Sequence, residues 1–317
     1  MFSQSLNKCL LLAKNSHRYA STLGKISVEA PKLKHFELHQ PYKNVINVNW
    51  NSPNGGNAMS MDTFTELKTT MDYLSDLPEC RSIVLTSSGK HFSVGLDLKN
   101  FPKIYFKYVV GKDCGARKAK FLGKMIGYIQ GCISSLENCS KPVIVCTNGA
   151  VIGAAVHVCL SGDIRFSLED TQFCIKEIDL GLAPDIGALE RIQKVVGNDS
   201  LTRELCYTGR TFTGNEALNY GMVSRTFKNK KEMDEAGFKL ANEIASKSPV
   251  AVEATKMQLN YARNHTVAES LDHIKLMNMS FLQSKDFFVD STKIKDGSKP
   301  EFENIDCGKS LNEIIKI

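Results

Sequence analysis

Short apolar runs separated by a long helical segment are the feature that most limits how this chain can fold. Ile83–Thr86 and Pro142–Cys146 are each long enough for one buried strand, and the helical stretch Lys118–Leu136 lies between them. Strands that are apolar throughout, rather than alternating, are typical of sheets covered on both faces. A strand, a helix and a second such strand predict a parallel βαβ unit, and therefore an α/β fold.

The flanking regions extend this pattern in both directions. Apolar clusters within 35–50, interrupted by the turn residues Gln40–Asn44, predict a pair of strands, and Met61–Leu77 has apolar residues at helical spacing. Beyond Pro184 the chain is predicted to be mostly helical, over 186–195, 200–207, 215–220, 230–246 and 250–283. The sheet is therefore expected in the first two thirds of the chain, with helices closing the last third.

The formal charge of +6 is concentrated near the N-terminus. Four basic residues precede the first acid, Glu29, which leaves about +2 for the rest of the chain; they are Lys8, Lys14, Arg18 and Lys25. No long basic run or arginine-rich aromatic stretch follows, so no nucleic-acid partner is expected. No apolar run approaches the roughly 20 residues that a membrane span needs, so no span is expected either.

Residues 1–28 have the composition of a targeting segment. They combine basic and hydroxyl side chains with the short apolar run Leu10–Ala13 and contain no acid, which predicts a mitochondrial transit peptide. His17–Ser21 resembles a matrix-protease cleavage region, and Lys316-Ile317 differs from a peroxisomal Ser-Lys-Leu signal. The mitochondrial matrix is the expected location, and a disordered N-terminal tail is the alternative.

The ten cysteines contain no Cys-x-x-Cys pair, and no secretory signal precedes them. Reduced thiols that act as small core residues are therefore expected, rather than disulfides. The histidines show no spacing that matches these cysteines as zinc ligands, so no metal site is predicted.

Two glycine-containing loops, His91–Leu98 and Asn148–Ala155, each lie between a predicted strand and a predicted helix. Strand-to-helix turns of this kind leave main-chain N–H groups unpaired, so two such loops can converge on one oxygen. A single loop would be weak evidence, because most glycine turns only accommodate a positive φ. Together the loops predict an oxyanion site.

Carboxylates eight positions apart lie in the apolar segment between Lys176 and Gly187. Burial among the apolar residues of this segment would raise the pKa of Glu177 and Asp185 towards neutrality, as general acid/base chemistry requires. On pattern alone, functional and structural roles are about equally favoured for these two residues. For Asp179 a turn or a salt bridge is the favoured interpretation.

Several segments together resemble the crotonase (enoyl-CoA hydratase/isomerase) family, over about 33–284. The resemblance rests on six motifs, Lys141–Val145, Asn148–Ala155, Gly162–Arg165, Glu177–Gly187, Ser246–Val252 and His265–Leu271. It implies a spiral of βαβ units with two roughly perpendicular sheets and a C-terminal helical region. The implied divisions are a transit peptide or disordered segment (1–28), a core domain (29–245), a helical trimerisation region (246–290) and a solvated tail (291–317).

Within that family, an aspartate at Asp185 resembles the branch that isomerises 3,5-dienoyl-CoA to 2,4-dienoyl-CoA in β-oxidation. The resemblance implies that Glu177 and Asp185 transfer protons and that the N–H groups of Val94 and Ala154 bind the thioester oxygen. It further implies that the substrate, an acyl-CoA thioester, contacts Ala58, Val94, Gly95, Leu96, Asp97 and Gly153. No metal or redox cofactor is expected, because the thioester itself accepts the electrons. Homotrimers or homohexamers are the implied assemblies.

Two departures from the family pattern fall in this site. Gly153-Ala154-Ala155 replaces a run of three glycines, and His157 stands where the family usually has an acid. A hydratase needs two carboxylates to activate water, so His157 argues against hydration. His157 is a candidate modulator of Glu177, as a hydrogen-bond partner or as a cation, or else an inert packed residue. The alternatives are a Δ3-Δ2-enoyl-CoA isomerase that uses Glu177 alone and an inactive acyl-CoA binder.

Overall fold

The computed structural model describes residues 31–110, 114–287 and 300–306. The predicted transit segment 1–28 lies outside the described residues, as does most of the predicted tail 291–317. Among the described residues, no helix combines the length and the apolar character that crossing a membrane requires.

The described strands and helices alternate along the first two thirds of the chain. The strands are β1 (Phe36–Tyr42), β2 (Val45–Trp50), β3 (Ser82–Ser87), β4 (Val143–Thr147), β5 (Ala150–Ile152), β6 (Ile164–Leu168), β7 (Gln172–Cys174), β8 (Phe212–Thr213) and β9 (Arg225–Phe227). The α-helices are α2 (Met61–Asp76), α3 (Phe101–Tyr105), α4 (Gly115–Asn138), α5 (Ala154–Ser161), α6 (Ala188–Val196), α7 (Asp199–Thr208), α8 (Gly214–Asn219), α9 (Lys230–Ala245), α10 (Pro249–Ala262) and α11 (Val267–Phe281). Short 3₁₀ turns form η1 (Gly55–Asn57) and η3 (Glu177–Leu180), and η2 (Phe106–Val110) is a π-helical turn.

The strands form two sheets. The larger has the order β1-β2-β3-β4-β6-β9, in which β1 and β2 are antiparallel and all the other neighbours are parallel. The smaller has the order β5-β7-β8. Both β3 and β4 are buried along their whole length, as their continuous apolar sequences predict. The predicted α/β fold with two sheets and C-terminal helices is confirmed.

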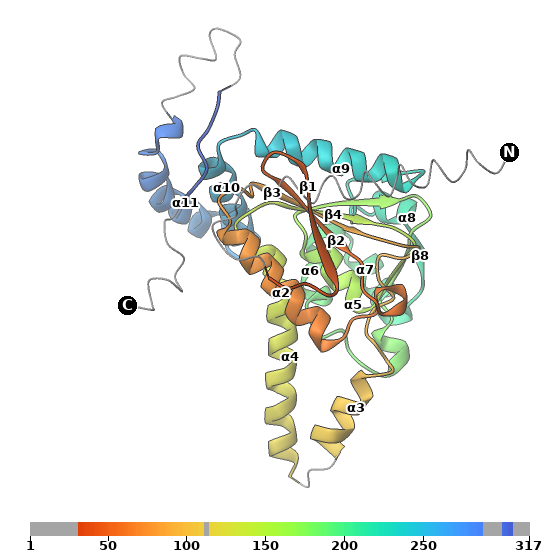
Figure 1. Ribbon diagram of the computed structural model, residues 1–317. Coiled ribbons are helices and arrows are strands. Elements are labelled where there is room, and N and C mark those ends of the chain that lie inside the picture. The colour runs from red at the N-terminus through yellow and green to blue at the C-terminus, as the bar shows by residue number, and fades with distance from the viewer. Residues whose placement is uncertain (1–30, 111–113, 288–299, 307–317) are drawn as a thin grey trace, which may run out of the picture.

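Hydrophobic side chains cover both faces of the larger sheet. Figure 1 shows α9 lying along one face, where Met233, Ala241 and Ala245 pack against Val84 and Ile144. The other face is covered by helices that include α2, α4 and α5. The main core is therefore continuous with the first turn of α5, which is part of the candidate site described below.

The helix predicted over Met61–Leu77 is present as α2. Ser60 caps it, accepting from the N–H of Thr63 while the Thr63 side chain accepts from the N–H of Ser60. The apolar residues that gave the helical spacing are all buried, namely Phe64, Leu67, Met71 and Leu74. Here the local sequence determines both the start of the helix and its buried face.

The C-terminal third differs from the prediction in two respects. The stretch predicted as helical over 250–283 is two helices, because α10 ends at Ala262 and Thr266 caps α11 in a second capping box with Glu269. The sheet also reaches further than expected, since β8 and β9 pair with β7 and β6. These strands have two and three residues, too few for an apolar pattern to reveal them.

Charged side chains connect distant segments of the chain. Asp163 and Arg165 do not pair with each other: Asp163 binds Lys256 at 2.8 Å, and Arg165 donates to the carbonyl of Met222. The described part of the tail returns to the main body, where Arg81 donates to the carbonyl of Phe302 at 2.6 Å.

The described cysteines are unpaired, and all of them except Cys114 are buried. Burial raises the pKa of the Cys159 thiol to about 12, so this group stays protonated at physiological pH. Reduced core thiols are therefore confirmed for this part of the chain.

Candidate active site

The two glycine loops identified in the sequence lie side by side. The N–H of Ser93 donates to the carbonyl of Ala150 at 3.1 Å, and the N–H of Ile152 donates to the carbonyl of Ser93 at 3.2 Å. At Gly95 the φ angle is +85°, and a Cβ there would lie 2.4 Å from the carbonyl oxygen of Ile152. Only glycine permits this approach, so its presence explains how the loops come together.

Two main-chain N–H groups at this junction have no acceptor within the described chain. Ala154 is the first residue of α5, where N–H groups have no partner inside the helix. Leu96 lies opposite Met59 in a short parallel β-bridge. The residues on either side of Leu96 make its hydrogen bonds: the N–H of Met59 donates to the carbonyl of Gly95, and the N–H of Asp97 donates to the carbonyl of Met59. The N–H of Leu96 therefore points away from Met59. A Cβ on Gly95 would lie 3.6 Å from the nitrogen of Ala154, so the two donors are close neighbours.

The assignment of Val94 as an oxyanion donor needs correction. Its N–H already donates to the carbonyl of Gly56 at 3.0 Å, while its side chain is exposed and packs on Gly56. The sequence placed Leu96 among the substrate contacts but did not identify its N–H as a donor. No local signal distinguishes the two residues, because the pairing of Met59 with this loop is a tertiary contact.

Glu177 begins η3 and lies against the start of α5. A Cβ on Gly153 would lie 3.2 Å from Oε1 of Glu177, and Gly153 has a φ of +52°. The Glu177 side chain is 16% exposed. Gly153 therefore leaves space for a carboxylate next to the N–H of Ala154, which accounts for a glycine at this position.

His157 lies one turn into α5 and is fully buried. Its Nδ1 accepts a hydrogen bond from the main-chain N–H of Ala188 at 2.9 Å, and its Nε2 lies 3.1 Å from Oε1 of Glu177. Because a main-chain N–H can only donate, Nδ1 carries no proton and the ring is the neutral Nε2–H form. His157 therefore donates to the carboxylate of Glu177, and the interpretation of His157 as a cation is not supported.

The second carboxylate oxygen of Glu177, Oε2, is buried and has no hydrogen-bond partner within the described residues. A buried carboxylate oxygen that lacks a donor is unfavourable, because its hydration is lost without replacement. Such groups are found where a ligand completes the site. The carboxylate of Glu177 thus has one oxygen held in place and one free to accept a proton.

Asp185 lies on the turn that precedes α6, and its side chain is exposed. Partial burial raises the pKa of its carboxyl, and the nearby charge of Glu177 raises it further. Gln130 of α4 donates to the main-chain carbonyl of Asp185 at 2.7 Å. The structure therefore brings Asp185 within electrostatic range of Glu177, although it is held through its main chain.

The apolar residues around these acids are not arranged as expected. Ile178, Leu180 and Leu182 are exposed, so they do not enclose Glu177, which is buried instead by residues of α5. A 3₁₀ turn directs successive side chains to different sides, so apolar neighbours in sequence need not surround an acid. Asp179 forms an ion pair with Lys176, as predicted.

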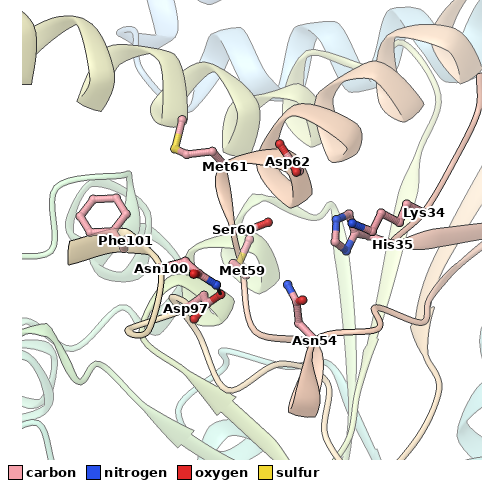
Figure 2. A pocket seen from close by; sticks show the side chains of 10 residues that line it. All are labelled: Lys34, His35, Asn54, Met59, Ser60, Met61, Asp62, Asp97, Asn100 and Phe101. Atoms are coloured by element: carbon pink, nitrogen blue, oxygen red, sulfur yellow. Dashed lines mark hydrogen bonds between the residues drawn. The ribbon is translucent and has the colours of Figure 1, made fainter. Parts of the chain in front are cut away.

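A cavity of about 290 Å³ lies next to the candidate site, and its lining includes Met59, Ser60 and Asp97. Figure 2 shows Asp97 and Asn100 on one wall, with Lys34 and His35 across the opening. Asn100 and Lys99 donate to the Asp97 carboxylate, and these bonds keep the pKa of Asp97 below its usual value. These bonds give Asp97 a structural role within its own loop. Nothing in the sequence had singled out Lys34 or His35.

The described residues contain no group of three or more histidines, cysteines, aspartates or glutamates placed to hold a metal ion. The chemistry available in the described site is that of two carboxyl groups, a neutral imidazole and main-chain N–H donors. These are groups that move protons and stabilise an oxyanion.

The chain belongs to the enoyl-CoA hydratase/isomerase family, whose model matches residues 40–304. The mitochondrial Delta(3,5)-Delta(2,4)-dienoyl-CoA isomerase of Homo sapiens is 41% identical over 77% of this chain and 74% of its own length. The peroxisomal enzyme of that name from Arabidopsis thaliana is 38% identical over 74% of this chain and 84% of its own. A putative enoyl-CoA hydratase from Streptomyces coelicolor has the same fold, with a TM-score of 0.77, 22% identity and coverage of 89% and 99%.

Proposed function

We propose that the protein is a Δ3,5-Δ2,4-dienoyl-CoA isomerase in the β-oxidation of unsaturated fatty acids, acting on acyl-CoA thioesters. The observation that carries this proposal is the Glu177 carboxylate, with Oε1 held by His157 and Oε2 free, beside the N–H groups of Leu96 and Ala154. Relatives about 40% identical over most of the chain, which have this activity in their names, support it.

In the proposed first step, Glu177 Oε2 removes a proton from C2 of the 3,5-dienoyl thioester. The electrons spread over the conjugated chain to the thioester oxygen, which accepts hydrogen bonds from Leu96 and Ala154. Loss of one such donor typically costs about 3–4 kcal/mol of transition-state stabilisation. The thioester is itself the electron acceptor, so the proposed reaction requires no metal or redox cofactor.

In the second step, Asp185 delivers a proton to C6, which gives the 2,4-diene. The raised pKa of Asp185 suits this role, because the group keeps its proton to a higher pH than a free aspartate does. Transfer of the proton taken by Glu177 back to Asp185, through solvent, restores the starting state. The chemistry also permits Glu177 to serve C6 and Asp185 to serve C2.

Hydration is disfavoured by the same geometry. Both ring nitrogens of His157 are occupied, one by Ala188 and the other by Glu177. A neutral imidazole in this arrangement has no free lone pair with which to activate water. Isomerisation within the acyl chain uses no water, so His157 is compatible with it.

We place the nucleotide end of coenzyme A near the cavity of Figure 2. Met59, which follows Ala58 in the chain, and Asp97 of the first glycine loop both line this cavity, and Lys34 supplies a positive charge at its rim. Phosphate groups bind such cations and main-chain N–H groups. Lys34→Gln is therefore expected to raise the KM for acyl-CoA and leave kcat unchanged.

We also propose that the chain assembles as a trimer or a pair of trimers through its C-terminal helices. Large apolar side chains are exposed on α10 and α11, namely Leu259, Val267, Leu271, Leu276 and Met279. A face of this kind is typical of a subunit interface. Light scattering of the purified protein should give three or six times the chain mass, and a monomer would contradict the proposal.

The mitochondrial matrix is the proposed location. Five relatives carry mitochondrial in their names, and residues 1–28 have a transit-peptide composition. Fusion of residues 1–28 to a fluorescent reporter should direct it to mitochondria. A cytosolic reporter would contradict this part of the proposal.

Conversion of a synthetic 3,5-dienoyl-CoA tests the proposed activity. The expected product is the 2,4-dienoyl-CoA, identified by NMR and by the absorbance of a diene conjugated with the thioester carbonyl. If the protein converts only 3-enoyl-CoA to 2-enoyl-CoA, it is the simpler isomerase. If it binds the thioester without any turnover, it is an acyl-CoA binder.

A further inference from the structure

Arg191 forms a connection between α6 and α4 behind the candidate site. Its Nη1 donates to the carbonyl of Gly187 at 2.9 Å, and its Nη2 donates to the hydroxyl of Ser134 at 3.0 Å. Nη2 also forms an ion pair with Glu137, which in turn pairs with Arg263 at the end of α10. One guanidinium therefore joins α4 to the turn that precedes α6.

Gly187 and the guanidinium are closely fitted to each other. Gly187 has a φ of +112°, and a Cβ there would lie 1.8 Å from Nη1 of Arg191. Any other residue at this position would displace the arginine side chain. Gly187 and the guanidinium of Arg191 are therefore packed directly against each other.

The turn 185–188 connects the two proposed catalytic carboxyl groups. It contains Asp185, and its last N–H, that of Ala188, donates to His157, which holds Glu177. Two side chains fix its main chain: Gln130 binds the carbonyl of Asp185, and Arg191 binds the carbonyl of Gly187. A shift of this turn would disturb both carboxyl groups together.

A role in stability alone does not account well for this arrangement. The Arg191 side chain is 11% exposed, and its Nε is buried with no hydrogen-bond partner in the described part of the chain. Buried ion pairs contribute little net stability, because desolvation offsets their attraction. Burial raises the pKa of Glu137, but Arg191 and Arg263 together keep it below its usual value, so Glu137 is ionised.

We propose that Arg191, anchored by Glu137, is a positioning residue for the reaction. By holding the carbonyl of Gly187 it fixes the turn 185–188, and through it both the Asp185 carboxyl and the Ala188–His157–Glu177 chain of hydrogen bonds. This inference rests on the proposed function, since it concerns the same two carboxyl groups. Arg191 itself does not touch the substrate.

Steady-state kinetics of Arg191→Gln, Arg191→Lys and Lys194→Gln test this role. Lys194 is a matched control, because it lies one turn along α6 and binds the carbonyl of Arg263 and the side chain of Asn264 rather than the turn. For Arg191→Gln we expect kcat on 3,5-dienoyl-CoA to fall about 30-fold, with KM within twofold, because displacement by about 1 Å can cost 100-fold. Lys194→Gln should keep kcat within twofold, and Arg191→Lys should recover part of the loss.

Thermal unfolding and hydrogen exchange at C2 in D2O complete the experiment. An Arg191→Gln protein that is folded and has wild-type kcat would overturn the inference, as would equal losses in Arg191→Gln and Lys194→Gln. If the wild type exchanges the C2 hydrogen of 3,5-dienoyl-CoA without forming the 2,4-dienoyl product, the proposed function fails. The positioning role of Arg191 is then judged from the C2 exchange rates of the variants. A wild-type protein that neither isomerises 3,5-dienoyl-CoA nor exchanges its C2 hydrogen would overturn both the proposed function and the positioning role of Arg191.

Discussion

The two carboxyl groups of the site are held in opposite ways. Glu177 is largely buried, and a side-chain hydrogen bond from a fully buried histidine fixes one of its oxygens. Asp185 is exposed, and the surrounding helices hold its main chain through Gln130 and through Arg191 at Gly187. One acid is therefore held at its functional atoms, whereas the other is held through its backbone and has an exposed side chain.

This difference suits two different tasks. A base that attacks C2 next to the oxyanion donors needs a defined lone pair, because its target atom is fixed by the thioester. An acid that delivers a proton to C6 acts on a part of the acyl chain further from the thioester. This part of the chain differs between substrates of different length. Four variant experiments can break or sharpen this comparison.

The largest loss is expected for Glu177→Gln. The amide keeps a hydrogen-bond acceptor for His157 but cannot take a proton, so kcat should fall about 10³-fold with little change in KM. Asp179→Asn is the matched control, because this exposed acid two positions away pairs with Lys176 outside the site. A Glu177→Gln enzyme within tenfold of wild type would remove Glu177 from its proposed role.

The second largest effect is expected for Asp185→Asn, and only for one substrate. Conversion of 3,5-dienoyl-CoA should fall about 10²-fold, since no acid then reaches C6. Conversion of 3-enoyl-CoA to 2-enoyl-CoA should stay within about threefold, because one carboxyl suffices for it. Equal activity of wild type and variant on the dienoyl substrate would favour a simple Δ3-Δ2-enoyl-CoA isomerase.

A smaller change in kcat is expected for His157→Phe. Glu177 and the N–H of Ala188 would both lose their buried partner, which should lower the free energy of unfolding by about 2 kcal/mol and kcat about tenfold. Val158→Ala, at a buried neighbour on α5, should lose stability and keep kcat. If His157→Phe also keeps its kcat, His157 is an inert packed residue.

The smallest effect is a pH-dependent change in stability. Because the pKa of Asp185 is raised in the folded protein, ionising this group costs more in the folded chain than in the unfolded one. Asp185→Asn should therefore raise Tm by about 1 °C at pH 7, a modest value because solvent screens an exposed group. The difference should vanish below the ordinary aspartate pKa of about 3.9. A difference that grows on acidification would contradict the sign of the shift.

The sequence was most informative where structure depends on local pattern. Continuous apolar runs identified β3 and β4, and the spacing of Phe64, Leu67 and Met71 identified the buried face of α2. Two carboxylates in a glycine-containing segment next to two glycine loops indicated the site. These features depend on strand burial, helix periodicity and turn chemistry, which neighbouring residues determine.

The sequence was least informative where the role of a donor or acceptor atom depends on a hydrogen bond with a distant segment. Val94 and Leu96 are equally plausible donors until Met59 is seen to pair with Gly95 and Asp97. The form of the His157 ring depends on Ala188, which is 31 positions away in sequence. Such assignments require coordinates, because they follow from hydrogen-bond direction rather than from residue type.

The position of deuterium in the product tests the central claim most directly. When 3,5-dienoyl-CoA is converted in D2O, proton removal at C2 and delivery at C6 should place one deuterium at C6 of the 2,4-dienoyl product, detected by NMR. Asp185→Asn should greatly slow the formation of this labelled product. A product without deuterium at C6 in fully exchanged enzyme, or one labelled at C4, would contradict proton delivery by a second carboxyl at the far end of the diene.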